Sequence, residues 1–294
     1  MQMIEGETSG GIKLNIPQHV KHYKIIGKLS NGATCCMFTG YDSIRKDFVA
    51  IKAMPLTYIK LFNLRKCIEK EIALMQEINH PNIVRFIDSF ETDDIIFIVT
   101  EYYSKGDLLD FLNGDSFSSF NQMIKFVRGI LEALKYLHKR GISHGDIKLE
   151  NIAIDKHMNP KLIDFGFAKT TFIASDDSKN GSLICASPEL FEDGDFNPIK
   201  VDMWAFGIML FAIVTHQFPY QHGDKEFIIN QIKKGNLILP DTIPSLIKDI
   251  IRKCTKIDPL KRPSASDLLK DELFKFSLFP KKNKLYHHQN KFSI

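Results

Sequence analysis

The most informative stretch of this sequence is His144-Gly145-Asp146-Ile147-Lys148-Leu149-Glu150-Asn151. It is followed by Asp164-Phe165-Gly166, whose aspartate lies 18 positions after Asp146. Upstream lies Val49-Ala50-Ile51-Lys52, and Glu71 follows Lys52 by 19 positions. Each motif alone has an ordinary explanation: a turn, a lysine on an edge strand, or a glutamate on a solvated helix face. Their joint order and spacing are specific, because unrelated chains would not share all of them.

This set of motifs resembles the eukaryotic protein kinase family, and Lys148-Leu149-Glu150-Asn151 resembles its serine/threonine branch. The resemblance covers about residues 23–276. It implies an α+β, bilobal protein kinase fold, with ATP bound between a small antiparallel β-sheet lobe that has one helix and a larger, mainly helical lobe. The expected organisation is a flexible leader (1–22), a kinase domain (23–276: N-lobe 23–101, hinge 101–106, C-lobe 107–276) and a basic C-terminal tail (277–294).

Hydrophobic periodicity agrees with this outline. Short β-type runs at residues 23–29, 37–41, 48–54 and 95–100 dominate the first third of the chain, and one helix is predicted at 64–78. Later segments are helical, at 121–139, 201–215, 246–254 and 265–269. The apolar run at 205–214 is half the length of a membrane span and predicts a buried helix.

Phosphoryl transfer builds charge on oxygen atoms, so a kinase site mainly positions and neutralises its reactants. By the resemblance, Lys52 holds the α and β phosphates of ATP, and Glu71 pairs with Lys52 and keeps it aimed.

The resemblance also assigns the catalytic residues. Asp146 accepts or orients the proton of the substrate hydroxyl, and Lys148 lies near the transferred phosphate. Asp164 binds the Mg²⁺ that bridges the phosphates, and Asn151 holds a second Mg²⁺. Carboxylate and amide oxygens suit such hard cations.

The nucleotide roof departs from the family pattern G-x-G-x-x-G-x-V. This chain reads Ser30-Asn31-Gly32-Ala33-Thr34-Cys35-Cys36-Met37, in which only the central glycine, Gly32, is kept. Glycine lets backbone approach phosphate closely, so the side chains of Ser30 and Cys35 are expected to stiffen or lift the loop. Met37 precedes Lys52 by 15 positions, which keeps the register. No G-x-x-x-x-G-K-[ST] motif occurs, which excludes a Walker-type NTPase.

Other ATP-binding residues follow from the same resemblance. They are Ala50 above the adenine, Leu108 and Ala153 below it, Thr100 at the gatekeeper position, Glu101 and Tyr103 with backbone groups at the hinge, and Asp107 at the ribose or at a basic substrate residue. The family has a larger apolar residue where Ala153 stands, so extra room is expected under the base.

Gly145 replaces the arginine that receives the activation-loop phosphate in the family. The hypothesis is therefore that activity does not depend strongly on phosphorylation of that loop, in which Ser175 and Ser178 are candidate acceptors and Lys169 a weaker partner.

Substrate preference is indicated at a few positions. Asp107 and Glu150 resemble the acidic residues that face arginine upstream of the acceptor, while Ala212 replaces a further glutamate. Phe167, directly after Asp-Phe-Gly, resembles the residue found in kinases that favour serine over threonine as the acceptor. Ser182 matches the family's hydroxyl that contacts the catalytic Asp and Lys.

The helical lobe carries further family motifs. Ser187-Pro188-Glu189 resembles Ala-Pro-Glu, with Arg262 as the partner of the glutamate. The resemblance also places Asp202, Trp204 and Gly207 on a helix that supports the catalytic loop. It further predicts a stacked apolar spine made of Met75, Phe86, His144 and Phe165.

Charge and cysteine content limit the partners. The net charge is +4, and residues 275–294 hold five lysines and no acidic residue. The body is therefore almost neutral, which argues against nucleic acid; membrane contact is unlikely, and the tail is a solvated extension or a docking segment. Five cysteines without C-x-x-C spacing favour a reducing compartment, the cytoplasm or the nucleus. The alternative function is a pseudokinase that binds nucleotide or partners without phosphate transfer.

Overall fold

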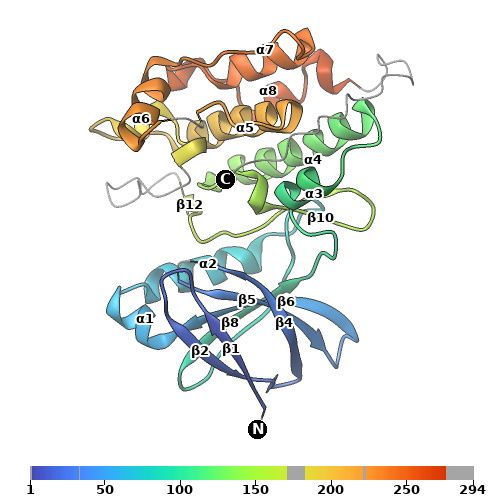
Figure 1. Ribbon diagram of the computed structural model, residues 1–294, viewed down its shortest axis with the longest axis vertical. Helices are drawn as coiled ribbons and strands as arrows, with labels where there is room; N and C mark the ends of the chain where they lie inside the picture. Colours follow the sequence, from blue (N-terminus) through green and yellow to red (C-terminus); the bar gives the residue numbers. More distant parts are fainter. Residues whose placement is uncertain (1, 33, 171–182, 221–222, 276–294) are drawn as a thin grey trace. The chain divides into compact units, whose positions relative to one another are not determined.

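The computed structural model describes residues 2–32, 34–170, 183–220 and 223–275 (Figure 1). The chain forms two compact units, Met1–Ser104 and Lys105–Ile294, divided within the segment 101–106. The residues proposed above at Ser175, Ser178 and Ser182, and the tail 277–294, lie outside the described residues.

The first unit is built on a six-stranded antiparallel sheet, in the order β3-β4-β5-β6-β8-β7. The four β-type runs predicted from the sequence form β4, β5, β6 and β8, which confirms the antiparallel sheet. The strands are β3 His19–Val20, β4 Tyr23–Asn31, β5 Cys36–Asp42, β6 Asp47–Pro55, β7 Phe86–Glu91 and β8 Ile95–Glu101.

Two helices follow β6. The longer one, α2 (Arg65–Glu77), confirms the predicted helix, and its buried residues Ile68, Glu71 and Met75 lie on one face because they are three and four positions apart. The shorter one, α1 (Leu56–Leu61), is not predicted by the sequence. Six residues are too few for a helical period to show.

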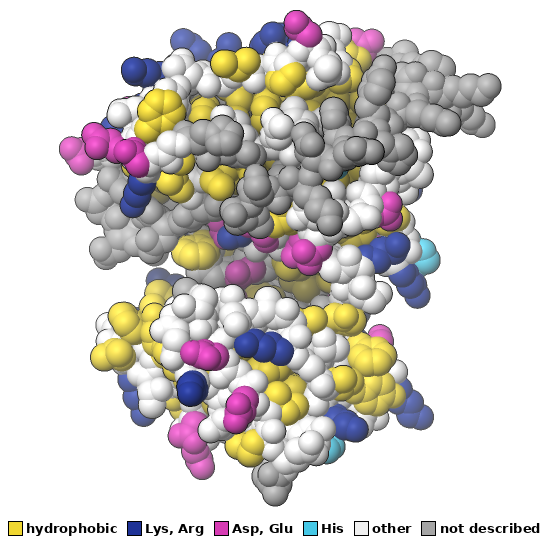
Figure 2. All heavy atoms as spheres, in the orientation of Figure 1, with side chains coloured by type: hydrophobic (Ala, Val, Ile, Leu, Met, Phe, Trp, Pro, Cys, Tyr) yellow, Lys and Arg dark blue, Asp and Glu magenta, His cyan; other side chains and the backbone are white. Residues whose placement is uncertain are grey.

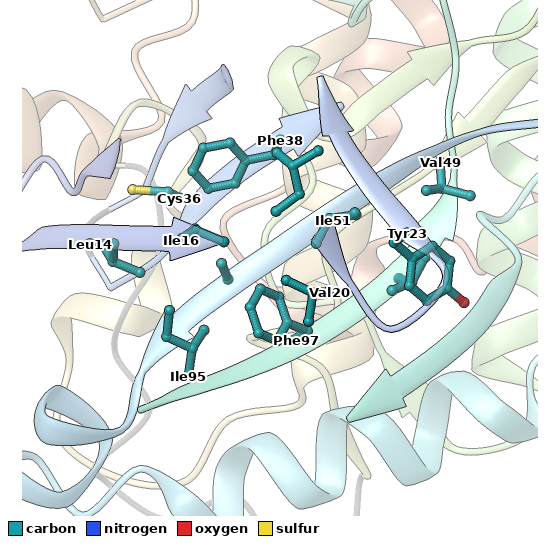
Figure 3. Close-up of a cluster of buried hydrophobic side chains, with 13 residues drawn as sticks. Leu14, Ile16, Val20, Tyr23, Cys36, Phe38, Val49, Ile51, Ile95 and Phe97 are labelled. Atoms are coloured by element: carbon teal, nitrogen blue, oxygen red, sulfur yellow. The ribbon is translucent and has the colours of Figure 1, made fainter. Parts of the chain in front are cut away.

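Residues 3–17 form a hairpin, which corrects the expectation of a flexible leader. Strand β1 (Met3–Glu7) pairs antiparallel with β2 (Lys13–Pro17). Leu14 and Ile16 of β2 are 3% and 0% exposed, and they lie beside Cys36 and Phe38 in the core (Figure 3). The expectation failed because the alternation of polar and apolar residues in β2 is only five residues long, and the nearby glycines and proline suggested an irregular segment.

Charges of both signs are mixed on one face of the first unit. On the face that Figure 2 shows, Lys and Arg side chains are dispersed among Asp, Glu and neutral ones. This face therefore lacks the single-signed field that nucleic acids favour. The expectation about nucleic acid remains a prediction.

The second unit is mainly helical, and the four helices predicted from the sequence are confirmed as α4, α5, α7 and α8; α3 and α6 are additional. Two short antiparallel strand pairs, β9 with β12 and β10 with β11, lie in the segment between α4 and α5. The helices are α3 Leu108–Gly114, α4 Phe120–His138, α5 Pro198–Thr215, α6 Lys225–Lys234, α7 Ser245–Cys254 and α8 Ala265–Leu268, and the strands are β9 Ile142–Ser143, β10 Ile152–Ile154, β11 Pro160–Leu162 and β12 Lys169–Thr170.

Helix α5 is the buried centre of this unit. It begins at Pro198 after the N-cap Asn197 and ends at Thr215, followed by the C-cap His216, which adopts a left-handed conformation. By length and composition it could cross a membrane, but 78% of its apolar window is buried inside the protein, as in the core helix of a soluble fold. A Cβ at Gly207 would lie 2.7 Å from the Cβ of Cys254, so this glycine lets α5 and α7 approach closely.

Candidate active site

The first unit holds a buried lysine–glutamate pair. Lys52 in β6 places its Nζ 2.8 Å from Oε1 of Glu71 in α2, and the two side chains are 15% and 7% exposed. A charge-assisted hydrogen bond in such a partly dry setting is stronger and more directional than one at the surface. It fixes the lysine side chain relative to the sheet.

Strand register gathers five of the predicted ATP-binding residues on one face of the sheet. Directly paired residues of antiparallel strands point to the same face. Ser30 pairs with Met37, Met37 with Lys52, and Ala50 with Thr100. Because Ala50 and Lys52 are two positions apart in β6, all five residues share the face that carries Lys52.

The roof and the hinge segment show more local structure. The N–H of Gly32 donates to the carbonyl of Cys35 at 2.8 Å, which closes a tight turn. At the other end of the face, the N–H of Glu101 donates to Arg85 at 3.1 Å, so this amide is not available to a base. The hydroxyl of Tyr103 donates to Oε2 of Glu101 at 2.7 Å.

In the second unit, three predicted catalytic residues form one cluster. Oδ2 of Asp146 lies 2.8 Å from Nζ of Lys148. Nδ2 of Asn151 donates to the same Oδ2 and to the Asp146 carbonyl, both at 2.8 Å. Asp146 and Asn151 are each 6% exposed, so the carboxylate is held by two donors in a nearly dry setting.

The charge on Lys148 is maintained by its neighbours. Burial lowers the pKa of Lys148, but the hydrogen bond and charge of Asp146, with the charges of Glu150 and Asp164, outweigh burial and raise that pKa above its usual value. Lys148 therefore remains cationic among three carboxylates. Asp164 is one of these carboxylates, so its charge acts on Lys148.

The loop that holds the catalytic cluster is anchored by Asp202 of α5. Its Oδ2 accepts the N–H of His144 at 2.8 Å, and its Oδ1 accepts the N–H of Gly145 at 2.9 Å. Nε2 of His138 lies 2.9 Å from the same Oδ2. The predicted support of the catalytic loop by this helix is therefore confirmed. The sequence did not point to His138, since nothing in the spacing from α4 to α5 marks it.

His144 joins the loop to the segment before Asp164. The Asp146 N–H donates to Nδ1 of His144, which leaves Nε2 to donate to the carbonyl of Ile163 at 3.0 Å, so the contacts favour the neutral ring protonated at Nε2. Its ring also meets Phe165 edge-on, 5.1 Å between centroids. This confirms the part of the predicted spine that lies in the second unit.

Asp164 adopts an unusual backbone conformation. Its φ is 61°, and its Oδ1 accepts the N–H of Gly166 at 3.2 Å. Aspartate tolerates the left-handed region better than most residues, and such conformations concentrate at functional sites. The N–H of Ile163 donates to the Asn151 carbonyl at 2.9 Å, which ties the two predicted metal-binding segments together.

The oxygen donors fit a divalent cation that arrives with a nucleotide. Because Nδ2 of Asn151 is turned toward Asp146, its Oδ1 is the amide atom left for a metal, and Asp164 adds a carboxylate. Mg²⁺ is usually held by one or two protein oxygens together with phosphates and water. Among the described residues, no group of three or more His, Cys, Asp or Glu could hold a metal ion by itself.

Asp107 begins α3 next to Ala153. Its Oδ1 caps the helix by accepting the N–H of Asp110 at 2.9 Å, and the two backbones at 107 and 153 form a bridge. Burial raises the pKa of Asp107 to about 6; backbone hydrogen bonds oppose this, and the charges of Asp110 and Glu150 add to it. Leu108 and Ala153 are buried.

The predicted pair of Glu189 and Arg262 is also confirmed. The guanidinium makes two bonds to the carboxylate, at 2.6 and 2.7 Å, and the Arg262 side chain is fully buried. Its remaining donors reach the carbonyls of Lys256, Lys200 and Ile257. This network fixes the segment after the catalytic loop to the end of the domain.

The protein kinase domain model matches residues 23–274. Among similar proteins, rat serine/threonine-protein kinase SIK1 is 31% identical over 249 residues, which cover 84% of this chain and 32% of that protein. Human NUAK family SNF1-like kinase 1 is 32% identical over 271 residues (90% and 40%), and chicken serine/threonine-protein kinase SIK2 is 31% identical over 255 residues (86% and 32%). The chain therefore spans about a third of the length of these curated relatives. The chain belongs to the protein kinase domain family.

Proposed function

We propose that this protein is a serine/threonine kinase, which transfers the γ-phosphate of ATP to a serine or threonine hydroxyl of a protein. The observation that carries the proposal is the Asp146 carboxylate, held at 2.8 Å by both Lys148 and Asn151. Its orientation is fixed before any substrate arrives. The relatives named as serine/threonine kinases support the same chemistry.

In the proposed reaction, the substrate hydroxyl oxygen attacks the γ-phosphorus while the bond to the β–γ bridging oxygen breaks. ADP leaves with that electron pair, and the hydroxyl proton passes to Asp146. Lys148, kept cationic by its neighbours, stabilises charge on the transferred phosphoryl group. Such a reaction needs positioning and electrostatic stabilisation more than covalent chemistry.

Two sets of residues are proposed to bind the nucleotide and its metal ion. The sheet face with Ser30, Met37, Ala50, Lys52 and Thr100 receives the nucleotide, and Glu71 keeps Lys52 oriented toward its phosphates. Asn151 and Asp164 would hold Mg²⁺. When bound, this ion neutralises charge on the phosphate oxygens. Glu101 and Tyr103 contribute backbone groups other than the Glu101 amide.

The proposed substrate is a protein segment with basic residues before a serine. Asp107 and Glu150 supply the negative charge, and Phe167, which is 38% exposed, supplies the preference for serine. All five cysteines are free, which supports a reducing compartment such as the cytoplasm.

The test is transfer of labelled γ-phosphate from Mg-ATP to a mixed serine/threonine peptide library. We expect transfer by the wild type and a loss of at least about 10³-fold in Asp146→Asn, which removes the base but keeps the shape. Asp249→Asn is the matched control, because Asp249 is exposed and pairs with Arg252 at the surface. Nucleotide binding without transfer by the wild type would favour the pseudokinase instead.

A further inference from the structure

The tip of the N-terminal hairpin is hydrogen-bonded to the nucleotide roof. The N–H of Ser9 donates to the carbonyl of Gly32 at 3.0 Å, and Gly32 in turn donates to Cys35 at 2.8 Å. Gly32 is the one glycine that this chain keeps in the roof motif. The hairpin therefore holds the roof at the residue whose backbone can approach phosphate most closely.

The body of the hairpin lies directly against the strand that follows the roof. A Cβ at Gly6 of β1 would be 3.0 Å from Cζ of Phe38 and 3.2 Å from Sγ of Cys36. Figure 3 shows Leu14 and Ile16 of β2 beside these two side chains, and all four are buried. The start of β5 is thus enclosed by the hairpin.

The hairpin and the predicted nucleotide lie on opposite faces of the sheet. Cys36 and Phe38 alternate in β5 with Met37, and Met37 shares its face with Lys52. A nucleotide on the Lys52 face does not compete with the hairpin for space. The hairpin can therefore support the roof while the nucleotide is bound.

The order of the hairpin and the order of the roof depend on each other. A two-stranded hairpin is marginally stable in water, so this one needs the apolar surface of β5. The roof lacks the flanking glycines that let the family's loop adapt. The position of the roof before nucleotide binds therefore determines how well its backbone can contact phosphate. A group held in its bound conformation loses less freedom on binding, which raises affinity.

We infer that the N-terminal hairpin is a positioning element for nucleotide binding, and that its Ser9–Gly32 hydrogen bond holds the roof in the position that accepts the phosphates of ATP. This inference rests on the proposed function. Because such coupling is reciprocal, bound nucleotide must also stabilise the tip of the hairpin.

The sharpest test is Ser9→Pro in the full chain. Gly11 donates to the Thr8 carbonyl at 2.9 Å, so Ser9 is the second residue of a turn, where proline is favoured. The substitution removes the N–H donor and keeps the turn. Ser9→Ala is the matched control, since it keeps the donor and removes only the hydroxyl.

For Ser9→Pro we expect KM for ATP to rise about fivefold, with kcat within about twofold of the wild type, the change that loss of one hydrogen bond produces. Ser9→Ala should match the wild type in KM, and all three proteins should melt at the same temperature. A merely structural role would lower the melting temperature or kcat and leave KM unchanged. Equal KM for ATP in the two variants would overturn the inference.

Hydrogen exchange gives a second readout that does not depend on catalysis. Mg²⁺ with a non-hydrolysable ATP analogue should slow exchange of the peptide that contains Ser9 in the wild type, and should slow it less in Ser9→Pro. Unchanged exchange in a wild type that binds the analogue would overturn this inference alone. A wild type that neither binds the analogue nor transfers phosphate would overturn the proposed function as well.

Discussion

The carbonyl oxygen of Phe167 lies where a side chain on Gly145 would begin. A Cβ at Gly145 would be 2.5 Å from that oxygen, closer than real Cβ contacts, and the φ of Gly145 is +82°. The two segments are also joined by strand pairing of Ser143, two positions before Gly145, with Lys169, two positions after Phe167. Gly145 is thus required by the close approach of two backbones, which explains why the family's arginine is absent here.

Gly145→Ala should therefore destabilise the fold by about 3 kcal/mol, since a left-handed conformation and a backbone clash are combined. Gly106→Ala is the matched control: its φ is +72°, but the nearest atoms would be 3.8 Å from the added Cβ. It should cost only about 1 kcal/mol, from the left-handed conformation alone. Urea unfolding of both variants measures the difference, and equal losses would show that Phe167 can move aside.

Activity should not depend strongly on phosphorylation of the loop that contains Ser175 and Ser178. The backbone of Phe167 takes the place where an arginine at 145 would begin, so the strong phosphate receiver of the family cannot form. Phosphatase treatment of active protein should change kcat/KM by less than about twofold, against the 10-fold or more that a lost charge-assisted contact produces. Phosphatase-treated Gly145→Ala, at a temperature where it is folded, serves as the control. A tenfold loss in the wild type would contradict the prediction.

Removing one partner of the Glu189–Arg262 pair should be far more costly than removing a surface charge. Glu189→Gln leaves a guanidinium that is 0% exposed without its carboxylate, which should cost about 3–5 kcal/mol. Asp249→Asn breaks the exposed pair with Arg252 at 3.4 Å and should cost about 0–1 kcal/mol. Denaturant unfolding provides both values, and a loss near 1 kcal/mol for Glu189→Gln would show that water reaches Arg262.

Much of the fold was predictable because motifs and long periodic segments carry it. Asp146, Lys148 and Asn151 are five positions or fewer apart, so one loop brings them together, and Asp202 and Arg262 followed from family motifs. The Lys52–Glu71 pair was predictable for the same reason.

The remainder depends on contacts that leave no pattern in a short stretch of sequence. The β1–β2 hairpin is stabilised by burial against Cys36 and Phe38, which only the fold brings near. His138 meets Asp202 across 64 positions. The occupied amide of Glu101 depends on Arg85, which no motif connects to the hinge.

Preference for a basic substrate should switch with pH through Asp107. Its pKa is about 6, because burial is reinforced by the charges of Asp110 and Glu150, so the carboxylate is charged above pH 6 and neutral below it. Two peptides that differ only by arginine or alanine upstream of the serine should differ in kcat/KM by about fivefold at pH 8, the worth of one partly exposed ion pair. This ratio should fall toward one at pH 5, and taking a ratio cancels pH effects common to both peptides. Asp107→Asn should lower the ratio at pH 8 and remove its change with pH, leaving only the preference that Glu150 supplies, whereas Asp110→Asn should keep the preference and move its midpoint to lower pH. A wild-type ratio that is flat between pH 5 and pH 8 would mean that Asp107 does not face the substrate.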